Sequence, residues 1–588
     1  MSGNRRLCTF LLPRTDVCEE KTLYFRGGTL SENALRITAG ETVSFNCYFN
    51  VFDYAIYAAY TSIQTLYYRL SLQGQGILRL RLIRPAECES GYEDRVLIEE
   101  PFSSSVPTEY TLPIFLPLLE GRGTIYLSVI ATNDSVFYGG GIDADRDPLR
   151  SVKVGIAVTT YKREAFVRRN VARLRAELPE HTFSVFVTDN GGTLSQEDVA
   201  GSVLIPNRNL GGSGGFARGI SEILKRGDCT HILLCDDDIA FESEIFLRTA
   251  ALLSYVTDPD RTMIGASMLF SDKQTYQQEI GSLWTGKMQL PIHRGIDLTD
   301  PLSLAKNAAH STPDYSGWWY NCFPVTVAQR YGLPYPFFIK VDDVEYCIRS
   351  KCDILLLNGI GVWHDSFNYK LTPALEYYLS RNGLILDALH FPQRGAFFHF
   401  GVLLRSVAKQ CLLQRYQTAD LIFRAFDDFL SGADAFRRID GETLHRELSS
   451  LGERPIPRAA LEEIGYDLSS PLRREDRGYI RLSAKQVLTL NGSLLPAKKG
   501  SYRVIDITAA DPIDFYRVRQ VVQYDPISEK GFLTKQKRGV LLRTAFRLLK
   551  YFFKLLFRFR KAQRSFADSF SETVSPEAWK ERFTEKTE

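Results

Sequence analysis

The sequence predicts an α/β protein in which an N-terminal antiparallel β-sandwich, a doubly wound parallel sheet and a mainly helical C-terminal region follow one another along the chain. Three observations lead to this prediction. The 588 residues exceed one ordinary domain and correspond to about three to four. Short segments of alternating polarity fill the first 150 residues, as in antiparallel sheets. From residue 151, apolar strands alternate with amphipathic helices, as in parallel sheets.

Composition and charge narrow the function classes. The chain is 44% hydrophobic and 24% charged, which predicts packed domains rather than disorder. A net charge of +3 provides no overall field for nucleic-acid binding. Ten scattered cysteines without a C-x-x-C pair indicate free thiols in a reducing compartment. No signal-peptide core and no long apolar run are found, so we expect a cytoplasmic protein that does not cross the membrane.

Residues 1–150 contain the strand-like segments from which we predict the sandwich. Examples are ETVSFNCYFN, ILRLRLIR, EYTLPIFLP and GTIYLSVIA, separated by Gly, Pro, Asn and Ser. Polarity that alternates every second residue, with turns between the segments, is typical of antiparallel β-sandwiches. The many aromatic residues suit a core as well as sugar binding, and a supporting role is favoured over sugar binding.

Residues 151–385 carry polar motifs at the ends of the predicted strands. SVKVGIAVTTYKR, TFSVFVTDNGG and THILLCDDD each end an apolar run in polar residues. Parallel α/β sheets bind ligands beyond the carboxyl ends of their strands. The motif NRNLGGSGGFARG precedes a helix and suits close approach of a diphosphate. It matches neither the dinucleotide-binding nor the P-loop spacing.

Carboxylates and a histidine form the candidate catalytic set. Asp236, Asp237 and Asp238 follow a strand directly, and such a group suits Mg²⁺ or Mn²⁺, although a solvated turn or a helix cap is the alternative. Asp342 and Asp343 follow the apolar YPFFIKV and could supply a general base or cap the next helix. The aromatic pair Trp318 and Trp319 is expected on a flexible loop that contacts an acceptor sugar, with a place in the core as the alternative.

Taken in order, these motifs resemble the inverting family 2 glycosyltransferases with a GT-A fold, and most closely the bacterial polymerising galactofuranosyltransferases. The resemblance covers residues 151 to about 385 and includes GWWYNC, FFIKVDDVEYCIR and VWHDSF. It implies a Rossmann-like GT-A domain. It also implies the roles of the site residues: donor binding by Arg163, Asn190, Asn209 and Asp236; metal binding by Asp236, Asp238 and His364; base catalysis by Asp343; acceptor orientation by Asp342.

The C-terminal sequence predicts several helices followed by a basic helix. We predict a mainly helical domain at 386–530, within which 478–525 has no assigned fold, and a membrane-surface helix at 531–566. Eleven basic residues and no acidic one lie between Lys535 and Arg564. An aromatic apolar face beside a cationic stripe is typical of helices at anionic membranes. Packing on its own protein is the alternative, and RNA binding is disfavoured.

The expected function is therefore metal-dependent transfer of galactofuranose from UDP-galactofuranose to a lipid-linked or glycan acceptor, in cell-envelope polysaccharide synthesis at the inner membrane face. Another donor sugar, such as rhamnose or glucose, is one alternative. A non-catalytic glycan-binding or membrane scaffold is a second, and a sugar-nucleotide nucleotidyltransferase is a third and less favoured one. The sequence leaves a homo-oligomer open.

Overall fold

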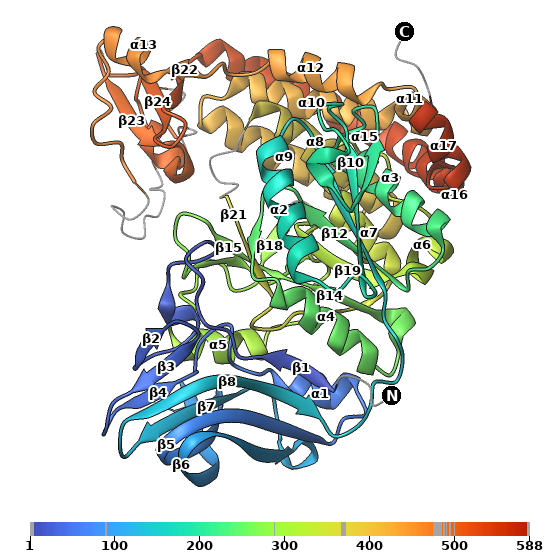
Figure 1. Ribbon diagram of the computed structural model, residues 1–588. Helices are drawn as coiled ribbons and strands as arrows, with labels where there is room; N and C mark the ends of the chain where they lie inside the picture. Colours follow the sequence, from blue (N-terminus) through green and yellow to red (C-terminus); the bar gives the residue numbers. More distant parts are fainter. Residues whose placement is uncertain are drawn as a thin grey trace. The chain divides into compact units, whose positions relative to one another are not determined.

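The computed structural model describes residues 5–88, 91–286, 289–365, 372–473, 485, 489, 491–492, 495–498 and 500–584 (Figure 1). The chain divides into two compact units. Unit 1 contains Met1–Pro334, Asp343–Asp365 and Pro576–Glu588, and unit 2 contains Tyr335–Asp342 and Ser366–Ser575. The four predicted domain ranges (1–150, 151–385, 386–530 and 531–566) follow other boundaries and stay predictions.

The N-terminal part of unit 1 forms one antiparallel sheet of eight strands. A long hairpin of β5 and β6 is its largest element, and β5 also pairs with β7 and β8. The antiparallel pairing agrees with the alternating sequence pattern, but the strands share a single hydrogen-bonded sheet, whereas a sandwich has two. The reason is the length of β5, which pairs with β6, β7 and β8 and so joins them into one sheet. The strands are β1 (Arg6–Thr9), β2 (Thr29–Ser31), β3 (Ala34–Ile37), β4 (Thr42–Ser44), β5 (Thr65–Pro85), β6 (Tyr92–Phe115), β7 (Thr124–Ala131) and β8 (Ser135–Ala144).

A seven-stranded central sheet follows in unit 1. Its order is β11-β10-β9-β12-β19-β14-β20, and the first four strands are parallel as predicted. The sheet is nevertheless mixed, because β19 runs antiparallel to β12 and β14. The residues before β19 therefore lie at the edge where the parallel strands end. The strands are β9 (Val154–Thr160), β10 (Phe183–Asp189), β11 (Val203–Pro206), β12 (His231–Asp236), β14 (Thr262–Gly265), β19 (Tyr320–Pro324) and β20 (Asp353–Leu355).

A second, smaller sheet and several helices complete unit 1. The sheet order is β13-β21-β15-β16. The helices α2, α3 and α4 connect strands of the central sheet, and Val167, Val171 and Leu174 form the buried face of α2. The sheet strands are β13 (Ala240–Phe241), β15 (Ser267–Phe270), β16 (Gln277–Glu279) and β21 (Gly361–His364), beside the hairpin β17 (Ser282–Trp284) and β18 (Gln289–Pro291). The helices are α1 (Tyr54–Tyr60), α2 (Glu164–Glu177), α3 (Gly211–Arg226), α4 (Glu244–Tyr255), α5 (Pro301–Ala308), α6 (Val325–Tyr331), α7 (Asp342–Ser350, of which Asp342 belongs to unit 2) and α17 (Pro576–Thr584).

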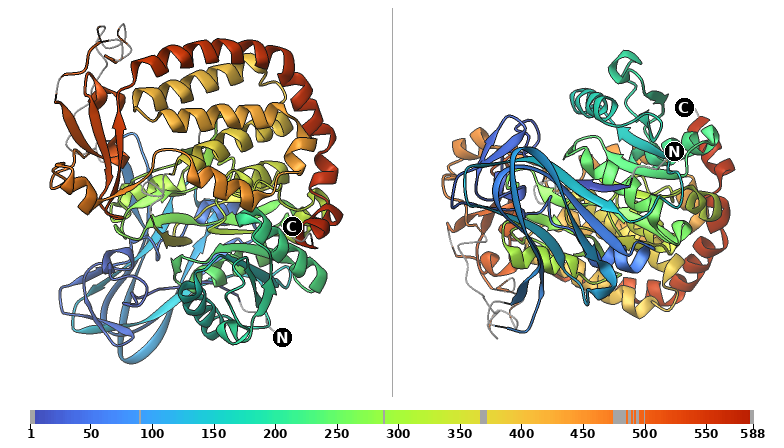
Figure 2. Two further views of the ribbon diagram at one scale, coloured as in Figure 1. Left: turned by 90° about the horizontal axis from the view of Figure 1, so that it is seen from above. Right: turned by 60° about the horizontal axis from the view of Figure 1, so that its bottom comes forward.

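Unit 2 is mainly helical and carries a four-stranded sheet. Its long helices lie side by side (Figure 2), and a core of Tyr377, Tyr378, Leu421, Ala425 and Leu448 joins three of them. The sheet β22-β25-β24-β23 takes in described parts of 478–525. The elements are α8 (Pro373–His390), α9 (Ala396–Leu412), α10 (Tyr416–Leu430), α11 (Ala433–Arg437), α12 (Gly441–Ser450), α13 (Arg458–Glu463), α15 (Arg538–Asp568), α16 (Phe570–Thr573), β22 (Ile456–Pro457), β23 (Tyr502–Asp506), β24 (Gln520–Asp525) and β25 (Lys530–Lys535).

Helix α15 has two apolar faces rather than the one that was predicted. One face is buried against α9 and α10, and it consists of Tyr551, Leu555, Phe559, Ala562 and Phe566. The other is exposed and consists of Leu542, Phe546, Leu549, Phe553, Leu556 and Phe557. Two residues of the predicted cationic stripe, Arg547 and Lys554, form ion pairs with Asp420 and Asp427 of α10. The helix therefore packs on its own unit and still presents apolar and basic side chains to solvent.

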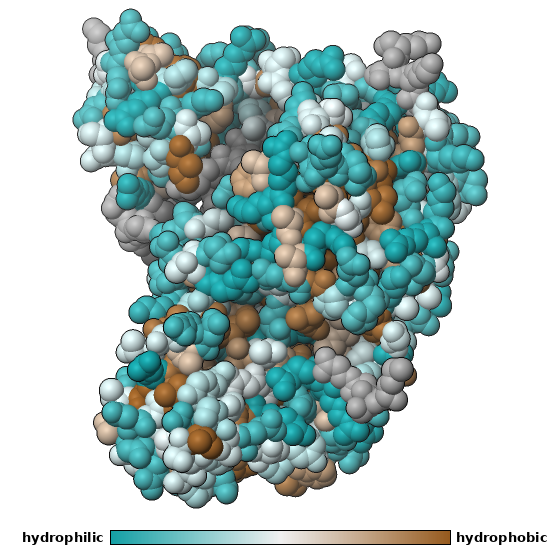
Figure 3. Space-filling model, in the orientation of Figure 1, coloured by the Kyte–Doolittle hydropathy of each residue, from teal (hydrophilic) through white to brown (hydrophobic). Residues whose placement is uncertain are grey.

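On the face shown in Figure 3, hydrophilic residues predominate and hydrophobic residues form scattered groups. Among the described residues, no helix combines the length and the apolar character needed to cross a bilayer.

Candidate active site and metal centre

Three side chains that are far apart in the sequence meet at the end of β12. Asp236 is the last residue of β12, and Asp238 lies in the turn that leads to β13. Strand β21 pairs antiparallel with β13, with Trp363 opposite Ala240. This register carries His364, the last residue of β21, to the Asp238 turn. One ligand atom from each of Asp236, Asp238 and His364 lies within 4.8 Å of the other two. We call these residues the triad.

The triad is built to hold a positive charge. His364 Nε2 lies 3.1 Å from Asp238 Oδ1 and 4.0 Å from Asp236 Oδ2. The imidazole is buried, and its Nδ1 lies 2.7 Å from the carbonyl oxygen of Asp365. An Nδ1–H donor leaves the lone pair of Nε2 directed at two carboxylates, as in histidines that bind metals. Three electron-rich atoms facing one another need a proton or a cation between them, so the residues fit a divalent metal ion.

The electrostatics of Asp236 agree with this interpretation. Burial raises the pKa of its carboxyl group, and the negative charges of Asp238 and Asp237 raise it further, whereas His364 and Arg163 act in the opposite direction. Desolvation and like charges both disfavour a bare carboxylate. A bound cation would remove this cost.

Asp237, the middle carboxylate, has a different position from its neighbours. It accepts a hydrogen bond from Thr160 Oγ1 at 2.6 Å, and Arg163 donates to it at 3.2 Å. Asn170 Nδ2 donates to the carbonyl of Asp237 at 2.9 Å and fixes the turn from α2. Sequence reasoning missed Thr160 and Asn170 as supports of the site. Thr160 is the last residue of β9 and lies in TTYKR, one of the polar motifs noted above at the strand ends.

The predicted donor-binding residues lie at the same edge of the central sheet. Arg163 pairs with Asp237 and Asp238. Asn190 donates to the carbonyl of Gly211, at the start of α3, at 3.0 Å. Asn209 Oδ1 accepts from the backbone N–H of Gly211 at 3.1 Å. The structure thus brings these three side chains together around the ends of β9, β10 and β12 and the first turn of α3.

The glycines of α3 allow this helix to pack closely on the sheet. A Cβ atom at Gly215 would lie 2.1 Å from Thr159 Cγ2 and 3.0 Å from Asn190 Nδ2. No side chain is accommodated at that distance. The packing of α3 on the sheet is therefore a sufficient reason for glycine at position 215. The predicted approach of a diphosphate to this motif stays a prediction.

Trp318 and Trp319 are buried in the turn before β19, which fits the alternative of a place in the core, and their role in acceptor binding stays a prediction. Their exposed fractions are 5% and 6%. Trp319 Nε1 donates to the carbonyl of Ala266 at 3.0 Å, and the Trp318 ring packs edge-on against Phe216 and Tyr346. The reason is the antiparallel β19, which draws the preceding residues against the sheet. Among the described residues, none accepts a hydrogen bond from the Trp318 indole N–H. The backbone N–H of Asp236 donates to the carbonyl of Trp319 at 3.4 Å.

Asp342 and Asp343 begin α7 after a strained turn. Phe338, Lys340 and Val341 have φ of 75°, 68° and 71°, a left-handed conformation that is costly for side chains and rarest for β-branched ones. The buried Asn382 of α8 holds the turn, because its Nδ2 donates to the carbonyls of Ile339 and Lys340, both at 2.9 Å. Strain of this kind concentrates at functional sites.

The charge of Asp343 also raises the pKa of Tyr315, and both residues belong to unit 1. Burial raises the pKa of the Tyr315 hydroxyl, and the charges of Glu279 and Asp343 raise it further. Glu279 is itself buried, and it accepts a hydrogen bond from Ser282. Asp343 and Glu279 therefore influence one tyrosine, which places two carboxylates in the surroundings of the aromatic segment before β19.

Comparison with curated proteins identifies the chain as a glycosyltransferase. No family model matches it. The galactofuranosyltransferase GlfT2 of Mycobacterium tuberculosis is 26% identical over 450 residues, which cover 71% of this chain and 69% of the relative. The enzyme of the same name from Mycolicibacterium smegmatis is 26% identical over 449 residues, which cover 71% and 68%. The chain is a homologue of these galactofuranosyltransferases.

Solved structures give weaker matches. The mannosyltransferase PcManGT from Pyrobaculum calidifontis, in complex with GDP-Man and Mn²⁺, is 12% identical, with a TM-score of 0.28, and covers 44% of this chain and 67% of its own. GalNAc-T7 with UDP, GalNAc and Mn²⁺ is 9% identical, with a TM-score of 0.31, and covers 42% and 49%.

Proposed function

We propose that the chain is a metal-dependent inverting glycosyltransferase that transfers galactofuranose from UDP-galactofuranose to a lipid-linked or glycan acceptor in cell-envelope polysaccharide synthesis. The observation that carries the metal-dependent chemistry is the triad, whose three ligand atoms lie within 4.8 Å of one another. The donor sugar is inferred from the two relatives, which are named as galactofuranosyltransferases.

The mechanism that we propose is a single displacement. The triad would hold Mn²⁺ or Mg²⁺, which supplies positive charge for the diphosphate leaving group. Asp343 takes the proton of the acceptor hydroxyl, and the oxygen attacks the anomeric carbon from the face opposite the diphosphate. The bond from the anomeric carbon to the diphosphate oxygen breaks in the same step, so the configuration inverts. UDP leaves with the bonding electron pair.

Other residues position the two substrates in this proposal. Arg163, Asn190, Asn209 and Asp236 bind the nucleotide sugar, which their place around the strand ends supports. Asp342 orients the acceptor. Trp318 and Trp319 contribute to the acceptor site from a buried position.

A donor panel with purified full-length protein tests the proposal. We expect UDP release with UDP-galactofuranose and acceptor, loss of release with EDTA and recovery with Mn²⁺ or Mg²⁺. Preference for a rhamnose or glucose donor would overturn the sugar assignment. No transfer with any donor, combined with glycan or vesicle binding, would favour the scaffold. Light scattering on the same sample gives the oligomeric state.

We also infer that unit 2 contacts an anionic membrane surface through α15, as a peripheral protein of the inner membrane face. The support is the exposed apolar face, in which Phe546 and Phe557 are 74% and 78% exposed. Arg543, Lys550, Arg558 and Lys561 flank it on the same helix. Aromatic side chains beside cations favour the boundary between headgroups and acyl chains.

A further inference from the structure

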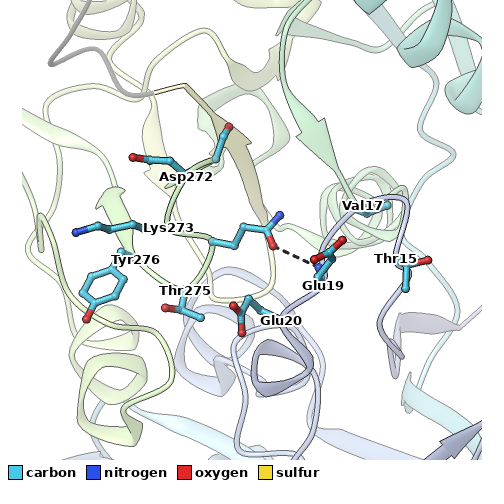
Figure 4. A pocket seen from close by; sticks show the side chains of 10 residues that line it. Thr15, Val17, Glu19, Glu20, Asp272, Lys273, Thr275 and Tyr276 are labelled. Carbon is cyan, nitrogen blue, oxygen red and sulfur yellow. Dashed lines mark hydrogen bonds between the residues drawn. The ribbon is translucent and has the colours of Figure 1, made fainter. Parts of the chain in front are cut away.

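A pocket in unit 1 is separate from the triad. It has a volume of about 630 Å³ and lies between an N-terminal segment and the loop that follows β15 (Figure 4). The first wall is Thr15, Val17, Glu19 and Glu20, and the second is Ser271 to Tyr276. Neither wall belongs to the motifs that the sequence singled out.

Hydrogen bonds fix the shape of this pocket. Gln274 Oε1 accepts from the backbone N–H of Glu19 at 3.3 Å and so joins the two walls. Trp363 Nε1 donates to the carbonyl of Gln274 at 3.0 Å. The loop closes on itself, because Phe270 N–H donates to the carbonyl of Tyr276 at 3.0 Å. A pocket held in this way needs little ordering when a ligand binds.

The side chains of the pocket select a neutral ligand rich in hydroxyl groups. Glu19, Glu20 and Asp272 offer carboxylate oxygens, which accept hydrogen bonds from hydroxyls. Tyr276 is 38% exposed and offers a ring face for the C–H groups of a sugar. Among the described residues of the lining, Lys273 is the one cation. Three carboxylates against one ammonium disfavour a nucleoside diphosphate or a phospholipid headgroup.

The pocket is connected to the triad through the backbone. Phe270, the last residue of β15, is the register partner of His364, and the N–H of Ser271 donates to the carbonyl of His364 at 3.1 Å. The pocket loop therefore starts on β15 directly beside His364, the last residue of β21. A saccharide chain that reacts near the triad can extend along this loop.

We propose that this pocket is a subsite for a neutral saccharide portion of the acceptor, away from the hydroxyl that reacts. The inference rests on the proposed function, because it assumes that the acceptor is a glycan. In this proposal, Glu20 and Tyr276 recognise the length of the acceptor. Longer acceptors are therefore expected to bind more tightly than short ones.

Two measurements on the full-length protein test the subsite. The probes are a galactofuranose disaccharide and a galactofuranose hexasaccharide. The variants are Tyr276→Ala and Glu20→Gln, and the control is Tyr138→Ala, which removes an exposed tyrosine from β8 of the same unit. Calorimetric titration of each probe without donor or metal measures binding alone, and initial rates give KM for each acceptor and for UDP-galactofuranose.

We expect Tyr276→Ala to weaken hexasaccharide binding and to raise its KM about tenfold, the effect of one lost aromatic contact. The values for the disaccharide and for the donor should change less than about twofold. An equal effect on both saccharides, or none, would overturn the subsite. If the wild type transfers no sugar, the proposed function fails, and the titration alone then decides whether the pocket binds saccharide.

Discussion

At the scale of single residues, the contact between His364 and Asp238 defines the site. The two residues are 126 positions apart in the sequence, yet His364 Nε2 lies 3.1 Å from Asp238 Oδ1. The DDD motif after a strand indicated a metal site, with a solvated turn or a helix cap as the alternative, because adjacent carboxylates repel one another unless a cation is bound. The histidine could be assigned only through the resemblance, since a lone histidine in a sequence is more often structural.

We predict that His364→Ala weakens Mn²⁺ binding about 10- to 100-fold, because one of three ligands is lost. Calorimetric titration of Mn²⁺ into the protein without donor measures this directly and does not depend on activity. His181→Ala, at an exposed position, should bind Mn²⁺ like the wild type. Unchanged affinity in His364→Ala would remove the histidine from the triad.

Asp343→Ala should abolish transfer, with a rate loss of at least about a hundredfold, because a general base contributes about 10² to 10⁴. UDP affinity should stay close to that of the wild type, since Asp343 acts on the acceptor. Rates and UDP titrations measure the two effects separately, and Asp134→Asn, in the exposed turn between β7 and β8, is the control. Wild-type turnover in Asp343→Ala would refute the assignment of the base.

At the scale of elements, close packing of α3 on β9 shapes the proposed donor site. We predict that Gly215→Ala lowers the free energy of unfolding by about 1–3 kcal/mol and weakens UDP binding, because the new methyl group displaces α3 from Thr159 and Asn190. Gly401→Ala in α9 is the matched control. A Cβ atom at position 401 would meet no atom within 4 Å. We therefore expect the Gly401→Ala variant to be as stable as the wild type or slightly more stable.

Helix α15 is the second element with a measurable role. Phe546→Ser combined with Phe557→Ser should lower binding to vesicles of anionic phospholipid about tenfold or more, because two exposed aromatic side chains are lost from one face. Co-sedimentation with anionic and with neutral vesicles measures binding. Phe115→Ser, at an exposed position of β6, is the control. Equal sedimentation of all variants would leave α15 as a packing helix.

At the scale of the whole molecule, a buried histidine links stability to pH. Burial lowers the pKa of His231, the first residue of β12, to about 4. In the unfolded chain the pKa is about 6.5, so acid protonates the unfolded state first. The contribution of His231 is complete above about pH 6.5 and declines as the pH falls toward 4, with a loss of about 2 kcal/mol at pH 5.

Urea unfolding of the wild type, His231→Leu and His181→Leu at pH 7.5 and pH 5 measures this contribution. We expect the difference between the two pH values to be smaller in His231→Leu by about 2 kcal/mol. His181→Leu should match the wild type. The comparison within each variant separates the titration from any change in packing, and an unchanged pH difference in His231→Leu would contradict the role of burial.

The sequence by itself determined the chemistry of this protein: the strands that end in polar residues, the paired aspartates and the amphipathic helix, because periodicity and residue type are local properties. The tertiary structure decided which of these groups meet. It placed His364 beside Asp238 through the pairing of β21 with β13, turned β19 against its neighbours so that Trp318 became buried, and gave α15 a second apolar face. These outcomes depend on strand order and on packing between distant segments, which no local pattern specifies.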